Sequence, residues 1–555
     1  MNMMKKIGVG LAIIAIGLFG VVTLSGCGES SDSASPEVKP IVVYGCEPQH
    51  PLVSTNTTET CGGDPLDLMN AALVSFDEKG NVLNDLAENI LTKDNKVFEV
   101  TLKEGLKFSN GEPITSQSFI KAWNYGALIS NGQSAEEFFQ PIKGYDAVSA
   151  VDAEDKPAPT AKEMSGLKEV DATHFNITLA EPSVTFKIRL GHTAFDPIPE
   201  SAFDADGKLT EGYGEHPVAS GPYKLAAWVH DEKIQLVPNE NYTGEHKAKN
   251  GGVTFKTYTG LEAAYSDLQS RSLDVIGSVP SSQTNSFRTD SSVVPYITEG
   301  TAYQGLTIPG YLQHFGWDEE GQLRRTAISK AIDRETIINQ ISAGLAVIPT
   351  GFAPSNPIIS GAALPVEGSD VFKFDATEAK ALWAKADAIS KFENPSLNLI
   401  INGDGGGKSL FEAITNSIKN NLGIESKLEL TPDFKTLLQM QNKGTATGAT
   451  RNGWQADYPS IENYITQQYL TGAGSNVAKY SNKEFDNLLL AAEKAPTLDE
   501  ANVIFAKAQA ILAKDLPSIP LYDNQYRFVT STDVDNASVK VTWKSVPDYV
   551  NIVKK

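Results

Sequence analysis

The apolar residues of this chain recur with two different spacings. In the first half, Phe175, Ile177 and Leu179 alternate with polar neighbours, and residues 97–102 have the composition of another strand. Such a two-residue period predicts half-buried β-strands. In the second half, apolar residues recur every three or four positions, which predicts amphipathic helices. Further strands are expected at residues 41–44, 223–229 and 233–237, and helices at 66–74, 116–129, 261–271, 323–332 and 336–341.

A strand, a helix and a second strand follow one another late in the chain. Their expected ranges are 397–401, 409–422 and 424–430, an order typical of a β-α-β unit with parallel strands. The glycine-rich loop before the helix has Asn402 where a phosphate-binding loop needs glycine. We therefore expect an ordinary strand-to-helix turn there, and an α/β fold in this region.

The composition limits the size and class of the protein. A chain of 555 residues, 41% of them apolar, exceeds what one hydrophobic core usually organises, so two or three domains are expected. The net charge of −21, from 47 basic and 68 acidic residues, argues against nucleic acid as a partner. The seven histidines include no pair three or four positions apart, and no CxxC motif occurs, so neither a metal site nor a cofactor is expected. Hydrolase motifs are missing too, and we do not expect an enzyme.

The N-terminus has the pattern of a lipoprotein signal peptide. Lys5 and Lys6 precede an apolar run over residues 7–22, and the sequence Leu-Ser-Gly-Cys ends at Cys27. The apolar run is shorter than the ~20 residues that a spanning helix needs. We expect residues 1–26 to be removed and Cys27 to become the lipidated N-terminus. The alternative is a simple membrane anchor with an incidental cysteine.

The segment that follows the lipidation site is polar. Residues 27–39 are rich in Ser, Asp, Glu and Pro, which predicts a flexible tether. Beyond it Cys46 and Cys61 stand fifteen positions apart. In an exported protein two such cysteines are more plausibly bonded than free, so we expect one disulfide between them.

One stretch near residue 455 stands out for its chemistry. It reads Arg-Asn-Gly-Trp-Gln-Ala-Asp-Tyr-Pro and places Asp457 between Trp454 and Tyr458. If this segment lines a cleft, the carboxylate is partly desolvated and needs a cationic partner, which a ligand's ammonium group could supply. The alternative is a helix-capping or turn aspartate ahead of Pro459.

Several segments together are similar to one known family. They are Asp-Leu-Ala-Glu at 85–88, Thr-Leu-Lys-Glu-Gly-Leu-Lys-Phe-Ser-Asn-Gly at 101–111, Ala-Ser-Gly-Pro-Tyr-Lys-Leu at 219–225, Pro-Asn-Glu-Asn-Tyr at 238–242, Leu-Arg-Arg-Thr-Ala-Ile at 323–328 and Pro-Ser-Ile-Pro-Leu-Tyr at 517–522. In this order they resemble the peptide/nickel class of ABC-transporter extracellular solute-binding proteins, the oligopeptide- and dipeptide-binding lipoproteins. The resemblance extends over nearly the whole mature chain.

The resemblance implies a fold of the periplasmic-binding-protein type. Two α/β lobes are joined by a hinge, and an extra domain is inserted in the first lobe. Lobe I is expected at 40–74, 205–302 and 528–555, the inserted domain at 75–204, and lobe II at 303–527. The ligand would lie between the lobes, which close over it.

The resemblance also implies roles for individual residues. The segment from Trp454 to Tyr458 matches the one whose aspartate, here Asp457, pairs with a peptide's α-ammonium in peptide-binding members. Arg451 falls where some members have an arginine that can bind a ligand carboxylate. Two further candidate ligand-binding residues are Gln304, after the expected hinge, and Glu47, at the cleft-facing end of the first strand.

The function implied is capture of peptides and their delivery to an ABC permease. The protein would act as a monomer, lipid-anchored on the extracytoplasmic face of a bacterial cell membrane. One alternative is the same scaffold binding a metal chelate, an oligosaccharide or a peptide pheromone. Another is an extracellular enzyme or adhesin.

Replacing the lipidated residue tests the predicted anchor. The tether is too polar to pack against the folded body. A Cys27→Ala variant is therefore expected in the soluble fraction with its folded body intact. Immunoblots of salt-washed membranes and supernatants would measure the partition. A variant that stays with the washed membranes would refute the anchor.

Overall fold

The computed structural model describes residues 38–403 and 407–555. The signal peptide predicted at 1–26, the lipidation of Cys27 and most of the 27–39 tether lie outside the described residues. Across the described ranges, no helix combines the length and the apolar character needed to cross a bilayer.

The described residues form one large mixed sheet of eleven strands. Its order is β15-β14-β16-β12-β17-β11-β1-β10-β9-β8, and β13 pairs with β17 off this path. The strands are β1 (Ile41–Gly45), β8 (Tyr223–Val229), β9 (Lys233–Pro238), β10 (Val253–Thr257), β11 (Val275–Ile276), β12 (Val293–Thr307), β13 (Ala346–Val347), β14 (Leu399–Asn402), β15 (Leu428–Thr431), β16 (Ala449–Gln455) and β17 (Ser518–Ser531).

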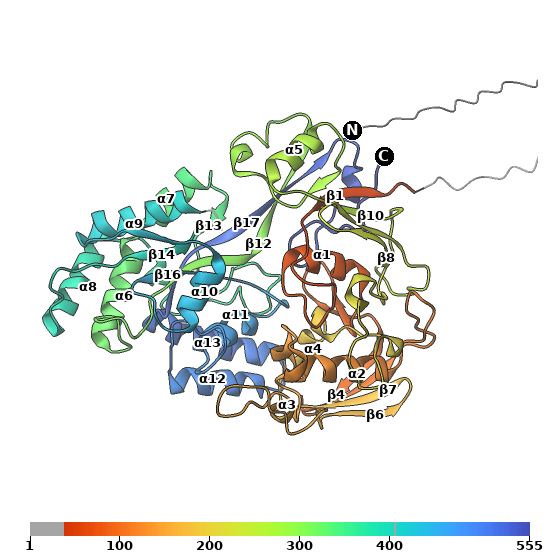
Figure 1. The fold of residues 1–555 in the computed structure, drawn as a ribbon. Helices are drawn as coiled ribbons and strands as arrows, with labels where there is room; N and C mark the ends of the chain where they lie inside the picture. Colours follow the sequence, from red (N-terminus) through yellow and green to blue (C-terminus); the bar gives the residue numbers. More distant parts are fainter. Residues whose placement is uncertain (1–37, 404–406) are drawn as a thin grey trace, which may run out of the picture. The chain divides into compact units, whose positions relative to one another are not determined.

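Strands β12 and β17 run side by side through the sheet as an antiparallel pair (Figure 1). At one end, Val293 and Val529 are buried in the core under helix α5 (Leu261–Gln269). At the other end, Leu306 and Ile519 are buried in a different core. The pairing register shifts between Glu299 and Tyr303, so the pair is irregular where it passes from one core to the other.

The second half of the chain supplies most helices, as its pattern predicts. They are α6 (Glu319–Ala331), α7 (Arg334–Ile341), α8 (Ala376–Ile389), α9 (Lys408–Leu422), α10 (Phe434–Asn442), α11 (Ile461–Tyr469), α12 (Lys483–Glu493) and α13 (Leu498–Asp515). The predicted β-α-β unit is confirmed, because β14 and β15 are parallel and α9 connects them. Ile414 and Ile418 of α9 are buried on its apolar face.

A separate four-stranded sheet and its core occupy part of the first half. The sheet has the order β4-β5-β7-β6, with β4 (Ala87–Thr92), β5 (Val97–Leu102), β6 (Leu167–Asp171) and β7 (His174–Thr178). Helix α2 (Ser116–Ala127) covers it, and its Trp123 is fully buried with the indole N–H donating to the carbonyl of Phe195. The short elements here are β2 (Val74–Phe76), β3 (Val82–Asn84), α3 (Tyr145–Val148) and α4 (Phe186–Arg189).

The helix expected at residues 66–74 is placed differently. Helix α1 covers Thr60–Met69, and Val74 already belongs to strand β2. Asn70 has an extended backbone, and the N–H of Ala71 donates to the Ser220 hydroxyl at 2.9 Å instead of continuing the helix. A partner 149 positions away therefore ends the helix, which the local pattern could not show.

The structure contains the disulfide expected between Cys46 and Cys61. Their Cα atoms lie 5.2 Å apart, and the bond joins the segment after β1 to the first turn of α1. Helix α1 is thereby fixed against the large sheet.

Removing this disulfide should destabilise the protein. Closing a loop of 15 residues restricts the unfolded chain, which is worth about 3 kcal/mol in the chain-entropy model. The double variant Cys46→Ser, Cys61→Ser is expected to lose roughly that free energy of unfolding, measured by urea denaturation. A reducing agent should destabilise the native protein similarly and leave the variant unaffected. Identical transitions in oxidised and reduced native protein would contradict the prediction.

Candidate functional site

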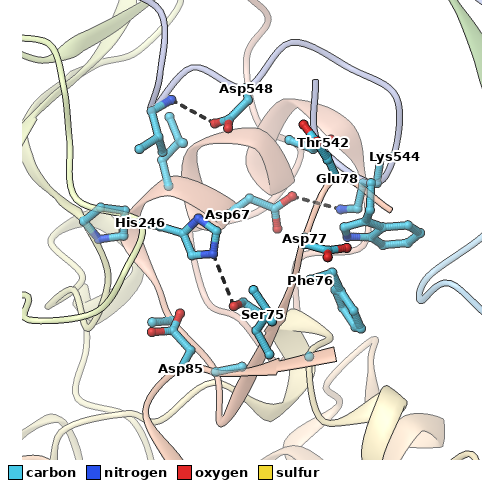
Figure 2. A pocket seen from close by; sticks show the side chains of 18 of the residues that line it. Asp67, Ser75, Phe76, Asp77, Glu78, Asp85, His246, Thr542, Lys544 and Asp548 are labelled. Carbon is cyan, nitrogen blue, oxygen red and sulfur yellow. Dashed lines mark hydrogen bonds and ion pairs between the residues drawn. The ribbon is translucent and has the colours of Figure 1, made fainter. Parts of the chain in front are cut away.

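A cavity of about 610 Å³ lies among segments that are far apart in the sequence. Helix α1, strand β2 and the segment 191–196 after α4 form part of its wall, and Asp457 faces it from the segment after β16. Figure 2 shows Asp67, Asp85, His246 and Lys544 around this space. The C-terminal part of the chain completes the lining with residues 540–551.

Asp457 is held in place by one asparagine of helix α11. The Asn463 amide donates to Asp457 Oδ2 at 2.9 Å, and its Oδ1 accepts from the Asp457 backbone N–H at 3.0 Å. The same Oδ1 accepts from the indole N–H of Trp454 at 2.8 Å. No hydrogen bond reaches Asp457 Oδ1 from the residues that the structure describes. One carboxylate oxygen is thus fixed, while the other can accept a donor from a ligand.

The carboxyl of Asp457 is partly desolvated. Burial raises its pKa to about 6, although the Asn463 hydrogen bond and the charge of Lys544 oppose the shift. The ionised form is therefore disfavoured until a cation comes close. A ligand ammonium group would supply that charge and a hydrogen-bond donor together.

Lys544 occupies a position between several carboxylates. Its Nζ lies 2.9 Å from Asp67 Oδ2 (Figure 2). Burial alone would lower the pKa of Lys544, but the charges of Asp67 and Asp64 outweigh burial and raise it. Asp457 contributes to the same effect. Burial, followed by the like charge of Asp67, raises the pKa of Asp64 to about 7. The single charge of Lys544 thus cannot neutralise all three carboxyls, Asp64, Asp67 and Asp457.

Tyr458 does not line the cavity and instead anchors the segment that carries Asp457. Its ring is 1% exposed, and its hydroxyl donates to Glu462 Oε2 at 2.7 Å. Arg189 of α4 forms an ion pair with the fully buried Glu462 at 2.9 Å. Glu493 of α12 lies 3.9 Å from Arg189, and burial raises the pKa of this carboxyl. This ion network joins α4, α11 and α12 directly beside Asp457.

The remaining predicted ligand-binding residues form two groups outside the lining. Arg451 donates to Gln304 Oε1 at 3.0 Å and to Asn402 Oδ1 at 2.8 Å. Glu47 accepts from the His230 ring at 2.7 Å and from the Asp231 backbone N–H. Of the predicted ligand-binding residues, Asp457 is therefore the one that lines the cavity. Trp454 stabilises its position indirectly, because the indole N–H donates to Asn463.

Several lining residues were not singled out from the sequence. The spacing of Asp64 and Asp67 was the available signal, because residues three apart share a helix face. Asp196 and Lys544 stand in segments without a motif. Only the tertiary structure brings these two residues to the same cavity.

Comparison with known proteins agrees with this architecture. The sequence profile of bacterial extracellular solute-binding proteins, family 5 Middle, matches residues 81–476, which is more than half of the chain. The chain belongs to this family. The family resemblance found in the sequence is thereby confirmed.

Relatives of this family-5 protein include named transport proteins. It is 28% identical to the periplasmic oligopeptide-binding protein OppA of Salmonella typhimurium over 473 residues, covering 82% of this chain and 81% of the relative. It is 24% identical to the dipeptide-binding protein of Lactococcus lactis over 505 residues, covering 87% and 88%.

Solved structures match the fold of the family-5 protein along most of its length. Haemophilus influenzae OppA in complex with RPPGFSPFR has a TM-score of 0.74 and 20% identity, covering 93% of this chain and 99% of that one. AppA of Clostridium difficile has a TM-score of 0.76 and 18% identity, covering 93% of this chain and 100% of that one. These matches confirm the expected two-lobed α/β fold class.

The raised pKa of Asp457 gives a stability prediction. The pKa is about 6 in the folded protein and ~3.9 in an unfolded chain, so folding favours the protonated form. The stability this group contributes is complete below pH 4 and is lost as the pH rises through 6. At pH 8, the free energy of unfolding of Asp457→Asn should therefore exceed that of native protein by up to about 3 kcal/mol.

Urea denaturation of ligand-free protein at pH 4 and pH 8 would measure this difference. The two proteins should be equally stable at pH 4. Glu104→Gln, which changes an exposed carboxylate outside the cavity and outside the helices, should show no difference at either pH. If Asp457→Asn were the less stable protein at pH 8, Asp457 would have an effective ionic partner in the free protein, which contradicts the prediction.

Proposed function

We propose that this protein is an extracytoplasmic solute-binding lipoprotein that captures peptides in a closing cleft and delivers them to an ABC importer. The observation that carries the proposal is the geometry of Asp457. Its carboxylate faces the cavity with Oδ2 fixed by Asn463 and Oδ1 open to a ligand. Every peptide with a free N-terminus has an ammonium group that suits such a carboxylate.

The family and its named members support peptide as the ligand class. Relatives that align over four fifths of this chain are named as oligopeptide-, dipeptide- and murein peptide-binding proteins. A fixed carboxylate recognises the N-terminal charge that all free peptides share. Hydrogen bonds to the backbone of an extended peptide do not depend on its side chains. Members of this family bind and transport solutes, which favours a receptor over an enzyme.

The lobe boundaries predicted from the sequence remain part of the proposal. Lobe I would comprise 40–74, 205–302 and 528–555, with the inserted domain at 75–204 and lobe II at 303–527. The register shift between Glu299 and Tyr303 lies beside the predicted boundary at 302/303. A strand pair that is irregular at this point suits a hinge.

Arg451 is proposed as a second contact, for the carboxylate of a ligand. Within the described residues, no carboxylate lies within ion-pair distance of its guanidinium, which binds the neutral side chains of Gln304 and Asn402 instead. A partly buried guanidinium without an anionic partner can bind a carboxylate in bidentate geometry. Both carboxylate oxygens of Glu47 already accept hydrogen bonds, from the His230 ring and the Asp231 N–H. Glu47 is therefore a weaker candidate for a ligand contact than Arg451.

The alternative is that the same scaffold binds a metal chelate, an oligosaccharide or a peptide pheromone. These ligands differ in whether they present a free ammonium group to Asp457. Mass spectrometry of ligand that co-purifies with the folded domain would distinguish them. Peptides with free N-termini support the proposal, whereas sugars or chelates overturn it.

Removing the Asp457 carboxylate should nearly abolish peptide binding. Loss of one partner from a desolvated ion pair costs roughly 3–5 kcal/mol, which is about two to four orders of magnitude in affinity. Calorimetric titration of Asp457→Ala with the tightest-binding member of a set of two- to five-residue peptides would test this. Asp499→Ala, which removes an exposed carboxylate outside the cavity, serves as the control and should bind normally.

A double cycle separates a direct contact from an indirect effect. Acetylating the peptide's N-terminus should weaken binding to the native protein by a similar amount, and far less in Asp457→Ala, because the pair is already absent. Equal binding of free and acetylated peptides by native protein would show that Asp457 is a structural turn residue.

A further inference from the structure

The charges that line the cavity do not balance. Nine acidic side chains line it, against three lysines and two histidines. Lys79 and Lys540 are exposed, and Lys544 already pairs with Asp67. His192 is neutral because burial, together with the charge of Lys544, lowers its pKa to about 3. Among the described lining residues, carboxyl groups therefore outnumber the cations that could pair with them.

Asp196 is a buried carboxyl of this cavity with one oxygen that the described residues leave without a partner. Its side chain lines the cavity and is 2% exposed, and its Oδ2 has no hydrogen-bond partner among the described residues. Burial and the like charge of Asp67 hold the pKa of Asp196 well above its usual range, although a hydrogen bond from the Asn70 side chain to this carboxyl opposes the shift. Buried polar atoms in native proteins nearly always have partners, so this oxygen needs an explanation.

Asp85 shows that burial in this cavity does not by itself leave a carboxyl unpartnered. It lines the same wall and is 5% exposed. Its two oxygens lie 2.9 and 3.1 Å from the Tyr242 hydroxyl, which donates to the carboxylate. The described part of the chain supplies a donor for Asp85 and none for Asp196 Oδ2.

The missing partner has the chemistry of an organic cation. Among the described residues, no three His, Cys, Asp or Glu side chains are arranged to hold a metal ion. A lysine ammonium or an arginine guanidinium brings both a charge and donor hydrogens to a single buried oxygen. A cavity of about 610 Å³ has room for such a side chain together with a peptide backbone.

An aromatic part of the cavity wall also suits the apolar stem of such a side chain. Phe76 and Trp543 both line the cavity and make an edge-to-face contact at 5.4 Å between ring centroids. A Cβ on Gly191 would come within 2.5 Å of the Phe76 ring, so the segment that carries Asp196 touches this aromatic wall. Methylene groups pack on such surfaces while the charged end reaches a polar group.

We propose that the cavity selects peptides that carry a lysine or arginine side chain, and that Asp196 is the residue that pairs with this second charge. The inference rests on the proposed peptide-binding function, in which Asp457 binds the α-ammonium. Asp457 and Asp196, which lie on different segments, would then bind the α-ammonium and the side-chain cation of the same ligand.

Peptides that differ in one charge test the selectivity on native protein. The probes are alanine peptides of two to five residues with free N-termini, in which lysine, acetyl-lysine or glutamate replaces each position in turn. At one position, lysine should bind about 10- to 100-fold tighter than acetyl-lysine, the range for a hydrogen bond to a charged group. Glutamate should bind most weakly. The measurement is calorimetry on protein that has been unfolded and refolded to remove ligand.

The outcomes distinguish the proposed selectivity for lysine from the proposed binding of peptides. Equal affinities for the lysine and acetyl-lysine peptides overturn the selectivity and leave peptide binding in place. No binding of any peptide overturns the proposed function itself. Because this comparison uses native protein, it decides the selectivity even if a variant does not fold.

Variants then test the role of Asp196. Asp196→Asn should lose the preference for lysine and keep its affinity for the acetyl-lysine peptide within about threefold, since only the charge pair is removed. Asp85→Asn is the matched control, a buried carboxyl of the same wall, and should keep the preference. An Asp196→Asn protein that still prefers lysine overturns the assignment.

Discussion

Strands β12 and β17 pair antiparallel along most of their length, and this pairing holds both ends of the eleven-stranded sheet together. Each strand contributes to two different cores, one with Val293 and Val529 and the other with Leu306 and Ile519. A rotation of one core against the other has to be absorbed near the register shift after Glu299. The cavity depends on this pair, because Asp457 follows β16, which pairs with β12 beyond that shift.

The position of Asp457 depends on a second set of contacts. Asn463 fixes the carboxylate, and Tyr458 ties the same segment to Glu462 and, through it, to Arg189. Arg189 ends helix α4, and the segment that carries Asp196 begins two residues later at Gly191. One buried ion network thus anchors the segment of Asp457 and the helix that precedes the segment of Asp196. Breaking one partner of such a network leaves an uncompensated charge, so it is costly to disturb.

Desolvated carboxyls are an energetic cost that the free protein carries. The pKa values of Asp457 and Asp64, raised by burial to about 6 and about 7, show that the ionised forms are disfavoured in the cavity. Binding sites often contain such locally unfavourable groups, since the ligand supplies what the chain lacks. An acidic cavity with only one paired lysine therefore fits a cationic ligand better than a neutral one.

Local sequence determined many of the elements and pointed to one residue of the candidate site. Strand β5 has the predicted bounds 97–102, β14 and β15 are parallel as expected, and Asp457 was recognisable between its aromatic neighbours. These features depend on neighbours in the chain, whose spacing alone sets a strand, a helix or a motif. The tertiary structure decided the end of α1, through Ser220, and the meeting of α1, Asp196 and Lys544 around the cavity. Such groupings join segments hundreds of residues apart, and only the folded chain brings their charges close enough to interact.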